Sequence, residues 1–256
     1  MLDLSPFRLN MFRQCRRKYK FHYLDGLQRQ YGKPQPHFTM GNHVHWSLNI
    51  FLRSTTPARK RTMEHLESLL RDRWVLDRSG FADRGQERDY WQKALRQLRG
   101  FFATQDVFAV PKMTEATHKA ALTPDLRLMG KIDRVDQAED GLVVIDYKTG
   151  RRPMAVDLLQ LRTYALILQK RFGQPVVSAR YLFLESGGVA EIRPEESDLG
   201  EAEEELIACG REIRGEQEFL AAPNRLCSYC DFLEICPEGI AYGGPRANPD
   251  EDEFPV

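Results

Sequence analysis

Three charged residues, Asp133, Asp146 and Lys148, have the types and the spacing that a site for metal-assisted hydrolysis requires. Asp133 lies near the end of residues 126–135, which alternate between apolar and polar as a strand does. Asp146 follows the apolar run 142–145, and Lys148 comes two residues later. Because residues i and i+2 of a strand point to the same face, Asp146 and Lys148 leave the end of a buried strand side by side.

Turn residues at 138–141 join the two expected strands into a β-hairpin, which brings the three charges into one small area. Two carboxylates there repel each other and lose hydration, and a divalent cation between them offsets both costs. Asp133, Asp146 and the carbonyl of Tyr147 would form an all-oxygen ligand set, which suits Mg²⁺ or Mn²⁺ better than zinc. Lys148 beside that cation could orient a water or stabilise charge on a phosphate. Taken alone, such a motif is more often a solvated ion pair on a surface hairpin.

Two expected helices supply further polar side chains. Residues 156–170 have helical periodicity, which puts Gln160 and Tyr164 one turn apart on the same face. A helix over residues 41–53 offers the imidazole of His45 as a metal ligand. A single histidine in such a helix is more often an ordinary buried side chain.

These residues form four motifs along the chain: GxxxH ending at His45, GxIDRVD containing Asp133, IDYKTG containing Asp146 and Lys148, and QLxxY from Gln160 to Tyr164. In this order the motifs resemble those of the RecB-type branch of the PD-(D/E)XK nuclease superfamily, over about residues 5–236. The resemblance implies that the catalytic residues are Asp133, Asp146, Lys148, Gln160 and Tyr164. It also implies that Mg²⁺ or Mn²⁺ is bound by His45, Asp133, Asp146 and the carbonyl of Tyr147. The family often carries another acidic residue before the hairpin, and Glu115 is a weak candidate because its neighbours are not distinctive.

The cysteines form a second pattern, since Cys227, Cys230 and Cys236 are spaced as C-x2-C-x5-C. Such close spacing favours a metal site over disulfides, and Cys15 is the natural candidate for a fourth ligand. Four thiolates suit zinc and an iron-sulfur cluster about equally well. The chain is similar to the AddB nuclease domain and the CRISPR adaptation nucleases, and this resemblance implies a [4Fe-4S] cluster held by Cys15, Cys227, Cys230 and Cys236, with structural zinc as the alternative. The fifth cysteine, Cys209, is expected to be a small buried hydrophobic residue.

The remaining pattern predicts an α/β fold with a restriction-endonuclease-like mixed central sheet flanked by helices. Helices are expected over residues 5–23, in two stretches of 61–106, and over 198–219, and strands over 107–122, 175–185 and 189–193. We interpret residues 1–240 as a single nuclease domain. Within it, residues 55–106 would form a helical insertion and residues 223–240 a cysteine loop that closes on the first helix as an Fe-S-stapled terminus. Residues 241–256 would form an acidic flexible tail.

The charge balance indicates that any DNA-binding surface is local, because 37 basic residues face 37 acidic ones and the formal net charge is zero. The candidate contacts for a phosphate backbone are Arg13, Arg16, Arg17, Lys18 and Lys20 in the first helix, and Arg151 and Arg152 after the IDYKTG motif. A basic run of this kind is more often a solvated helix face.

The motifs and the resemblance together predict a metal-dependent deoxyribonuclease, an exonuclease that acts on single-stranded or end-containing DNA in repair, recombination or CRISPR adaptation. Its possible partners besides DNA are a helicase or a CRISPR adaptation protein. The alternative is a nuclease-fold scaffold that binds DNA or a helicase without cutting. Because the sequence shows neither a signal peptide nor an apolar segment of membrane length, we expect a soluble, cytoplasmic protein with no membrane partner.

Overall fold

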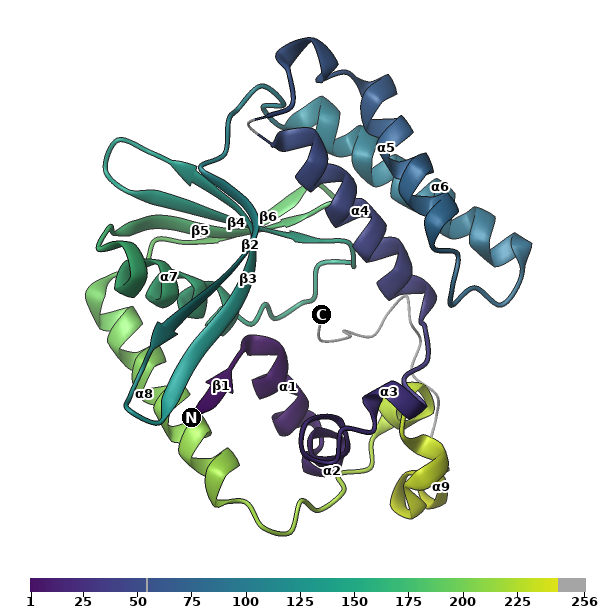
Figure 1. Ribbon diagram of the computed structural model, residues 1–256, viewed down its shortest axis with the longest axis vertical. Coiled ribbons are helices and arrows are strands. Elements are labelled where there is room, and N and C mark those ends of the chain that lie inside the picture. The colour runs from purple at the N-terminus through teal and green to yellow at the C-terminus, as the bar shows by residue number, and fades with distance from the viewer. Residues whose placement is uncertain (54, 244–256) are drawn as a thin grey trace.

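A mixed β-sheet of six strands forms the centre of the protein in a computed structural model that describes residues 1–53 and 55–243 (Figure 1). The strands lie in the order β1-β3-β4-β5-β6, and β2 pairs with β3 outside this path. The pairs β1–β3 and β4–β5 are parallel, and the other pairs are antiparallel. The strand bounds are Leu2–Leu4 (β1), Met113–Ala121 (β2), Leu126–Gln137 (β3), Leu142–Lys148 (β4), Val176–Phe183 (β5) and Gly188–Ile192 (β6). The predicted hairpin and the predicted mixed sheet are confirmed.

Helices cover both faces of the sheet (Figure 1). One layer consists of α4 (Pro36–Leu52), α5 (Met63–Leu76) and α6 (Arg84–Thr104), and the other of α7 (Leu159–Phe172) and α8 (Glu196–Gly215). Alternate residues of β4 pack into two separate hydrophobic cores: Ile145 and Tyr147 contact the α4–α6 layer, and Val144 contacts the α7–α8 layer. The strand ends therefore emerge between two helical layers.

The predicted continuous helix over residues 5–23 is wrong, because the chain bends at Cys15. Ser5 caps α1 (Pro6–Gln14) as expected, accepting a hydrogen bond from the amide of Arg8 at 3.1 Å. Cys15 then takes an extended conformation (φ −165°, ψ 112°). The chain continues as the short helix α2 (Arg16–Tyr19), a π-helical turn over Lys20–Leu24, and α3 (Gln28–Tyr31). Helical periodicity was satisfied on both sides of Cys15, and the local sequence carries no breaker that would reveal the bend.

Several other boundaries also differ from the prediction. The helix that carries His45 begins at Pro36 rather than at residue 41, because proline is well suited to the first helical position. Strand β1 was not predicted, since three residues are too few to show alternation. The cysteine-rich segment forms the 3-10 turns Arg225–Tyr229 and Leu233–Ile235, followed by α9 (Pro237–Tyr242).

Within residues 1–53 and 55–243, no helix combines the length and the apolar character needed to cross a membrane. Most of the predicted acidic tail, from residue 244 onward, lies outside the described residues.

Candidate active site

Three carboxylates lie on adjacent strands in one transverse row of the sheet. In the antiparallel pairing of β2 with β3, Thr114 lies opposite Arg134 and Ala116 opposite Ile132, so Glu115 falls level with Asp133. The pairing of β3 with β4 starts at Arg134 opposite Ile145, and one further step places Asp133 opposite Asp146. The row lies where β3 and β4 stop pairing, so backbone and side-chain groups there are free to make other contacts.

His45 from α4 joins this row and forms a group of three potential metal ligands with Glu115 and Asp133. Its Nδ1 atom lies 3.2 Å from Asp133 Oδ1 and 3.7 Å from Glu115 Oε1. One ligand atom from each of the three lies within 4.8 Å of the other two. Asp133 Oδ2 accepts a hydrogen bond from the amide of Tyr147 at 2.8 Å, which fixes its carboxylate. Asp146, a predicted ligand, lies outside this group.

The neighbouring acidic side chains set the protonation state of His45. Burial alone would lower the pKa of His45, but the charge of Asp133 and hydrogen bonds with Asp133 and Glu115 raise it to about 10. Burial also opposes ionisation of Glu115, yet hydrogen bonds with His45 and Lys131 lower the pKa of Glu115 to about 2. The pKa of Asp146 is raised to about 6 by burial, against the opposing charge of Lys148. The raised pKa of His45 indicates that the neighbouring carboxylates favour a positive charge between them.

Lys148 is held beside Asp146 by residues of α7. Its Nζ atom lies 3.1 Å from Asp146 Oδ2 and donates a hydrogen bond to Gln160 Oε1 at 2.9 Å. Gln160 Nε2 donates to Tyr164 Oη at 2.8 Å, and Tyr164 Oη donates to the carbonyl of Lys131 at 3.0 Å. The placement of Gln160 and Tyr164 on one helix face, predicted from their spacing, is confirmed.

Glu115 contributes to the group although the sequence indicated it only weakly. Its backbone has φ of 50°, a left-handed conformation that is uncommon for residues other than glycine. Such strain persists only where the surrounding structure enforces it, and it often occurs at functional sites. Both neighbours, Thr114 and Ala116, stay in register with β3. The strained conformation, which no sequence pattern reveals, accompanies the approach of Glu115 to His45 while the strand keeps its register on either side.

The family model described as the PD-(D/E)XK nuclease superfamily matches residues 3–237 of this chain. The chain belongs to this superfamily. No curated protein matches the sequence significantly.

Two solved structures are similar to this chain. A protein from Eubacterium rectale, provisionally named an exonuclease, has a TM-score of 0.55 and 11% sequence identity, covering 96% of this chain and 90% of that chain. The protein SSO0001 has a TM-score of 0.35 and 18% identity, covering 79% of this chain and 95% of that chain. The likeness to the first structure is a likeness of fold.

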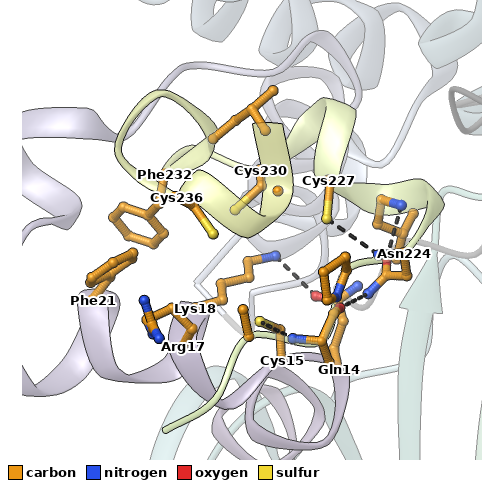
Figure 2. Close-up of a pocket in the computed structure, with 16 residues that line it drawn as sticks. Gln14, Cys15, Arg17, Lys18, Phe21, Asn224, Cys227, Cys230, Phe232 and Cys236 are labelled. Carbon is orange, nitrogen blue, oxygen red and sulfur yellow. Dashed lines mark hydrogen bonds between the residues drawn. The ribbon is translucent and has the colours of Figure 1, made fainter. Parts of the chain in front are cut away.

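A second feature of this superfamily member is a cavity lined by four cysteines (Figure 2). Cys15, at the bend between α1 and α2, faces three cysteines of the C-terminal segment: Cys227, Cys230 and Cys236. The amide of Ala222 donates to Cys15 Sγ at 3.5 Å, and the amide of Asn224 donates to Cys227 Sγ at 3.3 Å. The structure thus brings together four thiols that are widely separated in sequence. Cys209 lies elsewhere, on α8, where Arg13 contacts its sulfur at 3.1 Å.

The cations predicted to contact DNA in the first helix have partners within the protein. Arg13 pairs with Glu205 at 2.5 Å, and Arg16 pairs with Glu212 and Glu216 of α8 and its C-cap. The other three cations also have polar partners: Arg17 contacts Glu238 and the carbonyl of Phe219, Lys18 contacts Gln14, and Lys20 contacts Asp25. Arg13, Arg16 and Arg17 thus join the N-terminal segment to the C-terminal one. DNA contact by the five cations stays a prediction.

The remaining two predicted DNA contacts lie on the loop between β4 and α7. Arg151 and Arg152 are both exposed. Arg152 Nη1 donates to the carbonyl of Val189 at 3.1 Å, and its guanidinium lies 6.0 Å from the centre of the Phe183 ring. Both side chains are therefore a few residues from Lys148 and accessible to a ligand.

Proposed function

We propose that the protein is a metal-dependent deoxyribonuclease of the RecB type, an exonuclease that acts on single-stranded or end-containing DNA. The observation that carries this proposal is the group of His45, Glu115 and Asp133 next to the Asp146–Lys148 pair. Membership of a nuclease superfamily supports hydrolysis of DNA. A role in repair, recombination or CRISPR adaptation, with a helicase or a CRISPR adaptation protein as partner, follows from the resemblance of the motifs alone.

The residues present fit a hard divalent cation. His45, Asp133, Asp146 and the carbonyl of Tyr147 would bind Mg²⁺ or Mn²⁺, and Glu115, next to His45 and Asp133, would be a further ligand. Asp146 Oδ2 is buried and lies 3.1 Å from Lys148 Nζ, and a carboxylate oxygen has a second lone pair that a cation could use. When bound, the cation would supply positive charge for the phosphate and lower the pKa of a bound water.

Lys148 would hold the attacking water or stabilise the negative charge that develops on the phosphate. Gln160 fixes the direction of the ammonium through its Oε1 atom, and Tyr164 fixes Gln160 by accepting from its Nε2 atom. Because Tyr164 in turn donates to the carbonyl of Lys131, the arrangement on α7 is tied to strand β3. The chain of hydrogen bonds thereby fixes the lysine, which has four rotatable bonds, relative to the carboxylates.

We also propose that the four-cysteine cavity holds a [4Fe-4S] cluster rather than zinc. Four thiolates suit either centre. The preference for the cluster follows from the resemblance of the motifs, and the cavity that the four cysteines line supports a shared centre. Such a centre would join Cys15 to the C-terminal segment and act structurally.

The proposed activity is tested by digestion of end-labelled linear DNA and of circular DNA with Mg²⁺, Mn²⁺ or a chelator, using protein purified without oxygen. We expect metal-dependent cleavage that Asp146→Asn and Lys148→Ala abolish while DNA binding remains. A matched control is Lys112→Ala, because Lys112 contacts Gln137 and Gln174 away from the site. Cleavage by both site variants at the parental rate would refute the site, and metal-independent DNA binding without cleavage would favour the scaffold.

A further inference from the structure

Tyr181 on β5 lies in the same transverse row of the sheet as the acidic residues. The parallel pairing of β4 with β5 places Tyr181 beside Asp146. Its side chain is buried, with 3% of its surface exposed. No motif in the sequence marks it, because its place next to Asp146 follows from the pairing of strands that are not adjacent in the chain.

Tyr181 contacts both Lys148 and Gln160, the residue that accepts a hydrogen bond from Lys148. The Lys148 ammonium lies 4.9 Å from the centre of the Tyr181 ring, within the range of a cation–π interaction. The Tyr181 hydroxyl lies 3.2 Å from Gln160 Oε1, the atom that accepts from Lys148. It also lies 3.0 Å from the carbonyl of Asp157, just before α7 begins. A phenol has one hydrogen to donate, so the two acceptors share it as a three-centre hydrogen bond at the start of this helix.

These contacts differ from those of an ordinary core aromatic. Phe183 lies two residues further along the same strand, is equally buried, and contacts Tyr181 with a centroid distance of 6.1 Å. Its own cation neighbour is Arg152, not Lys148. Packing alone would be served by a phenylalanine at position 181, whereas a hydroxyl aimed at Gln160 and a ring face beneath Lys148 serve the lysine.

We propose that Tyr181 is a positioning residue that acts through Gln160 and Lys148: its ring limits where the ammonium can lie, and its hydroxyl fixes the Gln160 carboxamide that receives the ammonium. This inference rests on the proposed nuclease function of the same site. It assigns to Tyr181 no contact with substrate or metal. Its removal should therefore lower kcat and leave KM for DNA and the affinity for Mn²⁺ unchanged.

The test compares Tyr181→Phe, which keeps the ring, with Tyr181→Leu, which removes both contacts. We expect kcat to fall about fivefold in the first variant and about fiftyfold in the second, with KM within about twofold of the parent. The controls are Tyr19→Phe, which removes a hydroxyl from another buried tyrosine, and Phe183→Leu, which removes a neighbouring ring. Both controls should keep the parental kcat while showing similar changes in thermal stability.

A double-mutant cycle separates positioning from general loss of structure. If the hydroxyl acts through Gln160, Tyr181→Phe should lower kcat by less than about twofold in a Gln160→Ala background. If the double variant instead loses the product of the two single-variant factors in kcat, the inference is overturned. An unchanged kcat in Tyr181→Leu, or an equal loss of kcat in Phe183→Leu, would also overturn it. Cleavage that depends on Lys148 but not on Tyr181 refutes this inference alone. A parental protein that does not cut DNA refutes the proposed function together with the inference.

Discussion

Binding of a divalent cation should release a proton from His45. The pKa of His45 is raised from the ordinary 6.5 to about 10, so the imidazole is protonated at pH 7.5. A histidine that ligates a metal must be neutral. Removing the proton at pH 7.5 costs on the order of 3 kcal/mol, because each of the roughly 2.5 pH units below the pKa contributes a little over 1 kcal/mol. Metal binding at pH 7.5 should thus be about 300-fold weaker than binding to the protein with a neutral His45, and the affinity should rise about tenfold per pH unit up to about pH 9.

The assay is calorimetric titration of metal-free protein with Mn²⁺ in two buffers of different ionisation enthalpy. The difference in apparent binding enthalpy should correspond to about one proton released at pH 7.5. Below pH 6 the number should increase, because Asp146, with its pKa raised to about 6 by burial, then also binds a proton. Removal of the imidazole in His45→Asn should abolish the release at pH 7.5. An unchanged proton count in that variant, or tighter binding at lower pH, would show that His45 is not a ligand.

The raised pKa of His45 should also make the stability of the metal-free protein depend on pH. Because the folded-state pKa of His45 lies above its unfolded value, protonation of His45 stabilises the fold fully below about pH 6.5. This contribution is lost as the pH rises toward 10. Denaturation by urea at a series of pH values, with and without His45→Asn, measures the difference.

Three further predictions concern the framework of the site and the second centre. Gly130→Ala should destabilise the fold by about 1–3 kcal/mol in urea titrations, because the new Cβ would lie 2.7 Å from Tyr164 Cε1. The control is Gly100→Ala, whose Cβ would have nothing within 4 Å, and this variant should be neutral or stabilising. Arg61→Met should cost about 2–4 kcal/mol in the same measurement, since the buried guanidinium donates to four backbone carbonyls that would lose their partner. Cys15→Ser should remove the brown colour and most of the iron and acid-labile sulfide of anaerobically purified protein and lower its melting temperature; unchanged iron content would exclude Cys15 as a ligand.

The pairing of the basic run with α8 illustrates why a charge pattern is a weak guide to ligands. The sequence shows cations in the first helix and acidic residues near position 205, nearly 200 positions apart. Which of them meet depends on how α1 and α8 pack, and Arg13 and Arg16 meet Glu205 and Glu212. Exposed pairs of this kind contribute little stability individually, but they occupy charges that would otherwise face a phosphate backbone.

Local patterns in the sequence were enough to determine the hairpin, the side-by-side exit of Asp146 and Lys148, and the helical spacing of Gln160 and Tyr164. These features depend on periodicities of 2 and 3.6 residues, which any short segment expresses by itself. The C-terminal cysteine triplet was evident for the same reason, because its spacing is local.

The tertiary structure decided which distant residues join these local features. Strand register placed Glu115 and Tyr181 in the row of Asp133 and Asp146, and the packing of α4 brought His45 to that row. Neither alignment leaves a periodic trace, because each depends on contacts between segments far apart in the chain. The left-handed backbone of Glu115 and the bend at Cys15 belong to the same class, since both conformations are enforced by the surrounding fold rather than by the residues themselves.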